Sequence, residues 1–217
     1  TADASAGKAN RSIVCEIGVF SSGMSCVTTS GVFNSDWDDD IRVLDQSGTE
    51  DNTLLKDTAP TLPVVNTTGL QAMAAAQGYD NSGHLTCTDG YPNNSFYQPD
   101  GVTPNVTTVT GDFTVPDGYD VYGIFVVNGD VTIGTGATLH GVIYSTSGGN
   151  IELNHGSASN VSIVGGVLSS GNVSDNGWGT PPDIQYNRSF VDEFIAFGSV
   201  HRAAGGNLVT VGSWTYD

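Results

Sequence analysis

The sequence predicts a mainly β fold whose central part is a short right-handed parallel β-solenoid of about four coils. A stretch of 13 residues starting at Gly111 aligns without a gap with a second stretch starting at Gly129, 18 residues further on. In both stretches polar and apolar residues alternate, and Gly, Asn or Asp separates the β-rich segments. A short period of this kind is typical of coils that stack through backbone hydrogen bonds at roughly 4.8 Å.

The repeated region covers residues 106–175, and we expect three columns of short strands within it. Period-two alternation directs every second side chain into the interior, and glycines suit the tight corners. An antiparallel sandwich with coincidental spacing is the alternative, but the alignment of three columns favours the solenoid. The side chains expected to point inward are Phe113, Val115, Val131, Ile133, Ile151 and Leu153, with an interior column of Phe125, Ile143 and Leu168.

Residues 1–105 form an N-terminal region of several expected elements. β-Branched residues around a Ser-Ser-Gly turn predict a hairpin. Thr67 or Thr68 can cap an alanine-rich helix that ends at Gly78, and prolines keep the stretch before it extended. The elements are a small Ala-rich segment at 1–10, the hairpin at 12–33, an acidic loop at 35–52 with a short strand at 41–44, one helix at 68–77 and an irregular loop at 80–105.

Residues 176–217 leave the repeat and are expected to form a C-terminal cap and strand. Ser189 is a suitable N-cap for a short helix over 189–197, with Asp192 and Glu193 in its first turn. We expect this helix to cover the open end of the solenoid, where an unpaired edge would otherwise be exposed. The alternation in residues 207–216 predicts a final strand.

The composition limits the classes of partner. The chain has 217 residues, of which 23 are acidic and only 6 are Lys or Arg, and its net charge is −17. So few cations argue against nucleic acid binding and against docking on an anionic membrane surface. No run of about 18 apolar residues occurs, so we expect no direct membrane span in this chain. Abundant Thr, Ser, Asn and Gly with little Lys indicates an extracellular or cell-surface protein.

Three cysteines allow one disulfide at most. Cys15 and Cys26 flank the turn of the predicted hairpin, so we expect a Cys15–Cys26 disulfide and an alkylatable thiol at Cys87. Seven N-x-S/T sequons are consistent with a glycoprotein, although a β protein rich in Thr, Ser and Asn also explains many of them. The candidate glycosylation sites are Asn10, Asn66, Asn93, Asn105, Asn160, Asn172 and Asn187.

An acidic cluster is the one candidate metal site. Asp36, Asp38 and Asp40 place carboxylates at alternate positions, as calcium loops do. The spacing departs from an EF-hand, because Ile41 stands where the invariant glycine would be and Ser47 stands in place of the final glutamate. Calcium is the only cofactor that the sequence suggests, and a solvated acidic loop explains the same residues.

No catalytic motif is present, and we expect a protein that is not an enzyme. Residues 106–175 contain no Lys or Arg, which disfavours a lyase that needs a cation to stabilise an enolate. His140 and His155 lie about one coil apart, but two histidines alone make a poor zinc site. Asp112 and Asp130 occupy equivalent positions and would stack at one corner. A pair of hydrolytic carboxylates is one interpretation, and aspartates that bind backbone amides in turns are the interpretation we favour.

The stretch from Val121 to Leu153, followed by Asp-Ile-Gln-Tyr-Asn at 183–187 and by Gly-Ser-Trp at 212–214, resembles the soluble part of PilX-like pilins of type IV pili. The resemblance covers about residues 60–215 and includes the segment before the predicted helix. Gly/Asn coil patterns also occur in bactofilin-like polymers and in tail spikes. Such pilins begin with a long hydrophobic helix that forms the filament core. This sequence lacks that helix, so either it was removed or a separate short pilin supplies it.

The resemblance implies a structural subunit of an extracellular, type IV pilus-like filament. Its partners would be copies of itself, a short hydrophobic pilin, or both. Small residues in the first ten positions would allow close backbone contact with a neighbour, and these are Ala2, Ala4, Ala6 and Gly7. The alternatives are a secreted carbohydrate-binding or carbohydrate-active solenoid and a filament-tip adhesin.

Overall fold

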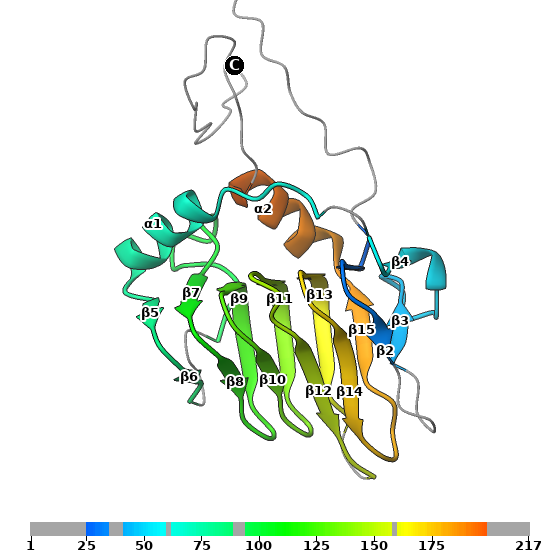
Figure 1. Cartoon of the computed structure of the whole chain (residues 1–217). Coiled ribbons are helices and arrows are strands. Elements are labelled where there is room, and N and C mark those ends of the chain that lie inside the picture. Colours follow the sequence, from blue (N-terminus) through cyan, green and yellow to red (C-terminus); the bar gives the residue numbers. More distant parts are fainter. Residues whose placement is uncertain (1–24, 35–40, 60–61, 89–93, 158–159, 199–217) are drawn as a thin grey trace, which may run out of the picture.

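The computed structural model describes residues 25–34, 41–59, 62–88, 94–157 and 160–198, and these residues form a parallel β-solenoid of about four turns (Figure 1). The predicted fold class is therefore confirmed. Within this part of the chain the strands form a long sheet of nine strands and a short sheet of six. All ladders between these strands are parallel.

The strands of the long sheet run, in spatial order, β3 (Arg42–Leu44), β15 (Asp183–Tyr186), β13 (Ser162–Ser169), β11 (Thr138–Ser145), β9 (Asp120–Val127), β7 (Val106–Thr110) and β5 (Asp80–Ser82). Two more strands, β1 (Val27–Thr29) and β4 (Leu55–Lys56), join it beside β13. The short sheet runs β2 (Phe33–Asn34), β14 (Val173–Gly177), β12 (Ile151–His155), β10 (Val131–Ile133), β8 (Phe113–Val115) and β6 (Leu85–Thr86). The described helices are η1 (Asn52–Leu54, 3₁₀), α1 (Thr67–Gln77) and α2 (Arg188–Gly198).

The described coils contain a long strand and a short strand where the sequence predicted three short ones. Each long strand turns a corner at a glycine, namely Gly123, Gly141 or Gly165, whose φ lies between 139° and 153°. A Cβ on Gly141 would lie 1.8 Å from the carbonyl oxygen of Gly123, and one on Gly165 would lie 1.7 Å from that of Gly141. Only glycine fits this corner, because its φ is positive and the backbone of the preceding coil occupies the space of a side chain.

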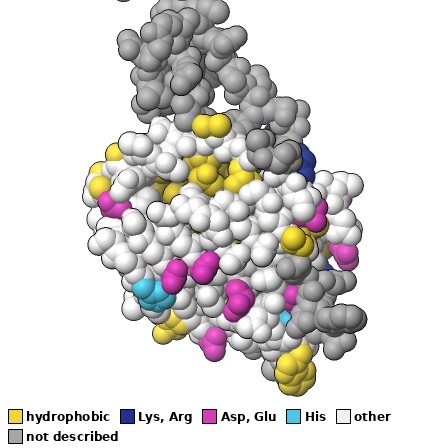
Figure 2. Space-filling view, in the orientation of Figure 1, with side chains coloured by type: hydrophobic (Ala, Val, Ile, Leu, Met, Phe, Trp, Pro, Cys, Tyr) yellow, Lys and Arg dark blue, Asp and Glu magenta, His cyan; other side chains and the backbone are white. Residues whose placement is uncertain are grey.

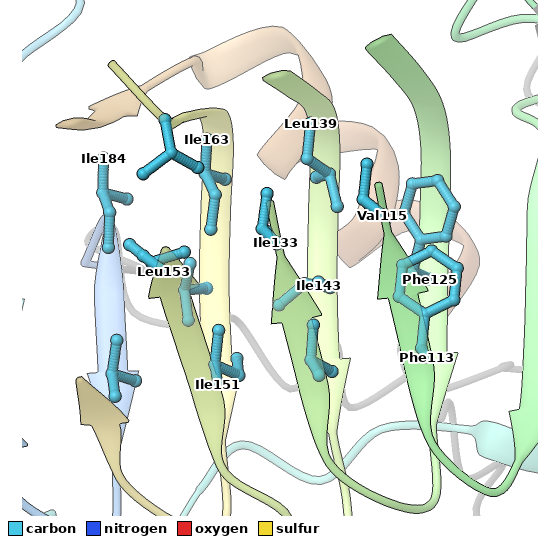
Figure 3. Close-up of a cluster of buried hydrophobic side chains, with 14 of the residues drawn as sticks. Phe113, Val115, Phe125, Ile133, Leu139, Ile143, Ile151, Leu153, Ile163 and Ile184 are labelled. Carbon is cyan, nitrogen blue, oxygen red and sulfur yellow. The ribbon is translucent and has the colours of Figure 1, made fainter. Parts of the chain in front are cut away.

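The interior is filled by side chains from both sheets, as the alternation predicted (Figure 3). Phe113, Val115, Val131, Ile133, Ile151 and Leu153 are all buried in it, and so are Phe125 and Ile143. The placement of Leu168 in the same column is wrong. Ile143 is in register with Val167, and Leu168 points outward into a second cluster. The error comes from Gly165 and Gly166, because the corner is at the first of these two glycines and not at the second.

Strands from the N-terminal region extend the solenoid at its C-terminal end. β1 pairs with the second half of β13 on one side and with β4 on the other, while β2 pairs with β14. The structure differs here from the expected hairpin, because β1 and β2 belong to different sheets and both run parallel to their neighbours. Pairing with β13 buries Cys26 and Val27 completely. The ladder therefore extends beyond residues 106–175, and residues 12–24 lie outside the described part.

A ladder of side-chain hydrogen bonds joins one corner of successive coils. Each Oδ1 accepts from a backbone N–H in the following coil: Asp112 from Asp130 (3.1 Å), Asp130 from Asn150 (2.8 Å), Asn150 from Asn172 (3.0 Å) and Asn172 from Val32 (2.9 Å). The favoured interpretation of Asp112 and Asp130 as turn residues is confirmed. The last step of the ladder reaches the N-terminal strands, so they continue the same register.

Both long helices lie against the outer face of the long sheet (Figure 1). α2 does not cover the open end of the solenoid, because its Val191 and Phe194 pack on outward-facing apolar residues such as Val142 and Leu168. Both helices have asparagine caps in place of the expected Ser and Thr. Asn66 Oδ1 accepts from Gly69 N (3.0 Å), and Asn187 Oδ1 accepts from Phe190 N (3.4 Å). Gly78 ends α1 with a φ of 82°, as predicted.

We predict that Gly141→Ala severely destabilises the fold while Gly118→Ala does not. The added methyl group at Gly141 would collide with the backbone of the preceding coil at Gly123, a cost of several kcal/mol out of a total stability of roughly 5–15 kcal/mol. Gly118 also has a positive φ of 73°, but no atom lies within 4 Å of its Cβ position. Its substitution should cost about 1–2 kcal/mol. Urea unfolding measures the free energy of unfolding of both variants. Equal losses of stability would contradict the claim that the corner at Gly141 requires glycine.

Candidate functional site on the outer face of the long sheet

The outer face of the long sheet is apolar, and the helices cover only part of it. After each corner glycine the outward side chains are Ile124 and Val126 on β9, and Val142 and Tyr144 on β11. Leu70 and Ala74 of α1 and Phe194 of α2 pack on this face. The ring of Tyr144 meets that of Phe194 edge-on, with 6.4 Å between their centroids. The same strands thus carry two cores, one on each face.

A groove of about 560 Å³ lies beside the helices, between the segment that precedes α1 and strands β7, β9 and β11. Its apolar lining comes from this segment, from the sheet and from Tyr144, and its polar lining consists of hydroxyl and amide side chains. Figure 2 shows hydrophobic side chains gathered in a hollow on the side of the molecule where the helices lie. The lining residues are Leu62, Pro63, Val64, Val65, Thr67, Gln71, Thr108, Val109, Thr110, Val126, Asn128, Tyr144 and Thr146.

The chemistry of the groove suits an uncharged and elongated ligand. No lining residue is ionised at neutral pH, and burial raises the pKa of the Tyr144 hydroxyl further. Val64 is 74% exposed, so an apolar side chain stands open to any ligand there. Hydroxyl and amide groups such as Thr108 and Asn128 can exchange hydrogen bonds with a peptide backbone. The arrangement fits binding and offers no acid, base or nucleophile pair.

A backbone hydrogen bond between the start of α1 and the end of α2 lies at the edge of this groove, next to Val65. Asn66 N donates to the carbonyl oxygen of Gly198 (2.6 Å), so the start of α1 is joined to the end of α2. A Cβ on Gly198 would lie 3.4 Å from Val65 Cγ1. The sequence identified residues 59–67 only as an extended stretch and did not reveal the groove. The sequence feature that points to this outer face is the continuous apolar run Gly-Ile-Phe-Val-Val at 123–127, which indicates a strand buried on both faces.

The histidines in the described part of the chain do not form a common site. The ring of His140 stacks on that of Tyr122, with 4.4 Å between centroids and 7° between planes. Burial lowers the pKa of His140, and the charge of Asp120 acts in the opposite direction. His155 lies in the interior, with Nε2 3.2 Å from Asp175 Oδ2. Among the described residues no group of three or more His, Cys, Asp or Glu could hold a metal ion.

Both described cysteines are buried thiols in the interior. Cys26 Sγ donates a weak hydrogen bond to the carbonyl oxygen of Ile184 (3.5 Å). Burial raises the pKa of Cys26 and of Cys87 from 9.0 to about 12. Cys87 is a free thiol in the structure, and its exposure of 2% makes it inaccessible to alkylating reagents as long as the protein is folded. Cys15 lies outside the described residues, so the Cys15–Cys26 disulfide stays a prediction.

The structure gives the described sequon asparagines different environments. Asn105 is fully buried and donates from Nδ2 to Ser95 O (2.6 Å), so a glycan there is incompatible with the folded chain. Asn66 and Asn187 cap helices, Asn172 belongs to the corner ladder, and Asn160 donates to Asp183 Oδ2 (2.8 Å). The remaining predicted site residues lie outside the described part of the chain, and these are Asn10, Asn93, Asp36, Asp38, Asp40, Ala2, Ala4, Ala6 and Gly7.

No family model, curated protein or solved structure matches this chain. The similarity to PilX-like pilins therefore stays a prediction. None of the helices in the described ranges is both long enough and apolar enough to span a bilayer.

We predict that iodoacetamide at pH 8 leaves Cys87 unmodified in the native protein and modifies it in denaturant. A thiol with a pKa of about 12 has a thiolate fraction of only roughly 10⁻⁴ at that pH. The variant Thr88→Cys places an exposed thiol next to it and should react in the native state. Mass spectrometry of the alkylated peptides checks both sites, and rapid native modification of Cys87 would contradict its burial.

The raised pKa of the Cys87 thiol also makes the free energy of unfolding depend on pH in the alkaline range. The unfolded chain releases the Cys87 proton near pH 9, whereas the folded chain holds it up to about pH 12. The contribution of this thiol is therefore fully present below pH 9 and is lost as the pH rises toward 12. The free energy of unfolding of the wild type should fall more steeply across this range than that of Cys87→Ala, as measured by urea titrations. Parallel curves would contradict the shift.

Proposed function

We propose that this protein is a structural subunit of an extracellular filament of the type IV pilus kind. In such a filament it would contact copies of itself, a short hydrophobic pilin, or both. The observation that carries the proposal is the position of β1. This first described strand of the chain lies inside the long sheet, between β13 and β4, and not at an edge.

The bonding of β1 suits a subunit that is held through its N-terminal side. Val167 N donates to Cys26 O (2.8 Å), and Ser30 N donates to Ser169 O (3.0 Å). Thr29 Oγ1 also donates to Gly171 O. A force applied along β1 would load these bonds in shear, so that they share the load and do not open one by one. A neighbour that binds residues 1–10 would in this way be connected to the whole solenoid.

The alternatives rest on the exposed faces of the solenoid. A carbohydrate-active solenoid needs carboxylates that are available to substrate, and the Oδ1 atoms of Asp112 and Asp130 are engaged by backbone amides of the next coil. A carbohydrate-binding solenoid or tip adhesin would use surface aromatic side chains such as the Tyr122–His140 stack. The rings of this stack face each other and are half-buried, which leaves little ring face for a sugar.

We expect immunogold labelling with antibodies against the folded protein to decorate the shafts of filaments sheared from producing cells. Cells that lack the gene provide the control, and their filaments should be absent or unlabelled. Gold confined to filament tips would favour the adhesin. Unlabelled filaments, together with a secreted monomer that binds a defined glycan, would contradict the proposal in favour of the carbohydrate-binding alternative.

We further predict that deleting residues 1–10 stops filament incorporation while leaving the melting temperature nearly unchanged. This segment is small, weakly charged and poor in large apolar residues, so it contributes little to the core. Val27→Asp is the control, because it places a carboxylate at a fully buried position and should abolish folding and incorporation together. Incorporation of the truncated chain at the wild-type level would exclude residues 1–10 as the docking segment.

A further inference from the structure

We propose that the groove beside α1 is a peptide-binding site and that its occupant is the C-terminal segment of the same chain, residues 207–216. The groove is open in the described part of the structure, and its lining combines apolar side chains with uncharged hydroxyl and amide groups. Its occupant should be uncharged, elongated and rich in apolar side chains. The groove would be filled in this way whether or not the protein enters a filament.

The point at which the chain leaves α2 brings this segment to the groove. Gly198 is the last described residue, and its carbonyl oxygen accepts from Asn66 N. Val65, which precedes Asn66, lines the groove and is the nearest side chain to the Cβ position of Gly198. The chain beyond residue 198 therefore starts at the rim of the groove.

The intervening chain is long enough to place residues 207–216 along the groove. Residues 199–206 can span at most roughly 26–29 Å when fully extended, at about 3.3–3.6 Å per residue. Gly205 and Gly206 stand directly before the segment and allow a change of direction.

The chemistry of the segment matches that of the lining. Its sequence is Asn-Leu-Val-Thr-Val-Gly-Ser-Trp-Thr-Tyr, with no charged residue, in a protein whose net charge is −17. A charged segment would lose its hydration against Leu62, Val64 and Val126, whereas this one buries apolar surface there. The indole N–H of Trp214 and the hydroxyl of Tyr216 require hydrogen-bond partners when buried, and Thr108, Asn128 and Thr146 can provide them.

The segment of the same chain is favoured over that of a second copy because it is tethered. A short flexible connection gives an effective concentration in the millimolar range. A second copy reaches this concentration only when the protein itself is that concentrated. The two occupants therefore differ in how their binding depends on protein concentration.

The test is hydrogen–deuterium exchange of the full chain, read by mass spectrometry on peptides that cover residues 207–216. We expect these amides to exchange at least about tenfold more slowly than an unstructured peptide of the same sequence. Val64→Asp places a charge on the groove wall at a position that is 74% exposed, so the fold should tolerate it. Protection of the segment should be lost in this variant.

Val102→Asp is the matched control, because Val102 is 67% exposed and does not line the groove. It should leave the protection of residues 207–216 unchanged, and equal melting temperatures of both variants and the wild type establish that the fold is intact. Protection that persists unchanged from high to low micromolar protein supports the proposal. The proposal is overturned by an unprotected segment, by protection that survives Val64→Asp, or by protection that disappears on dilution, which would assign the groove to a second copy.

Discussion

Where β9, β11 and β13 turn their corner, the backbones of neighbouring coils come so close that no side chain fits between them. This contact fixes the register of the long sheet, since a slip of one residue would bring a Cβ into a carbonyl oxygen. Along each of these strands the side chains alternate between the interior and the outer face. Val121 and Phe125 point to the interior on either side of the corner, while Ile124 and Val126 point outward. The helices, the second core and the groove all follow from that outward apolar face.

The repeat made the interior of the solenoid predictable. The alternation in β8, β10 and β12 gave the inward residues directly, because one pattern recurs in successive coils. The prediction failed where the pattern was locally ambiguous. Gly165 and Gly166 both satisfy a glycine corner, and only the packing of Val167 on Ile143 decides between them. The caps were missed for a similar reason. Asn66 stands directly before Thr67, and Asn187 stands two residues before Ser189. Asparagine, serine and threonine are all good N-caps.

The groove and the pairing of β1 and β2 could not be predicted from the sequence. β1 and β2 have three and two residues, which is too short for a periodic signal, and their partners lie about 140 residues away. Leu62, Pro63, Val64 and Val65 indicate an extended stretch, but which face of which sheet they border depends on how α1 and α2 pack. The apolar run in β9 did indicate that both faces of this strand are buried, though not what covers the outer one.

The closure of the solenoid by β1 and β2 imposes an order of events during synthesis. These strands leave the ribosome well before their partners in β13 and β14, which follow about 140 residues later in the chain. Until then the N-terminal strands lack their native neighbours, and the growing stack of coils ends in an unpaired edge that can capture another chain. High sequence separation of this kind slows folding. The N-terminal strands therefore stay without their native partners until β13 and β14 have been made, and a chaperone can act on the chain during this interval.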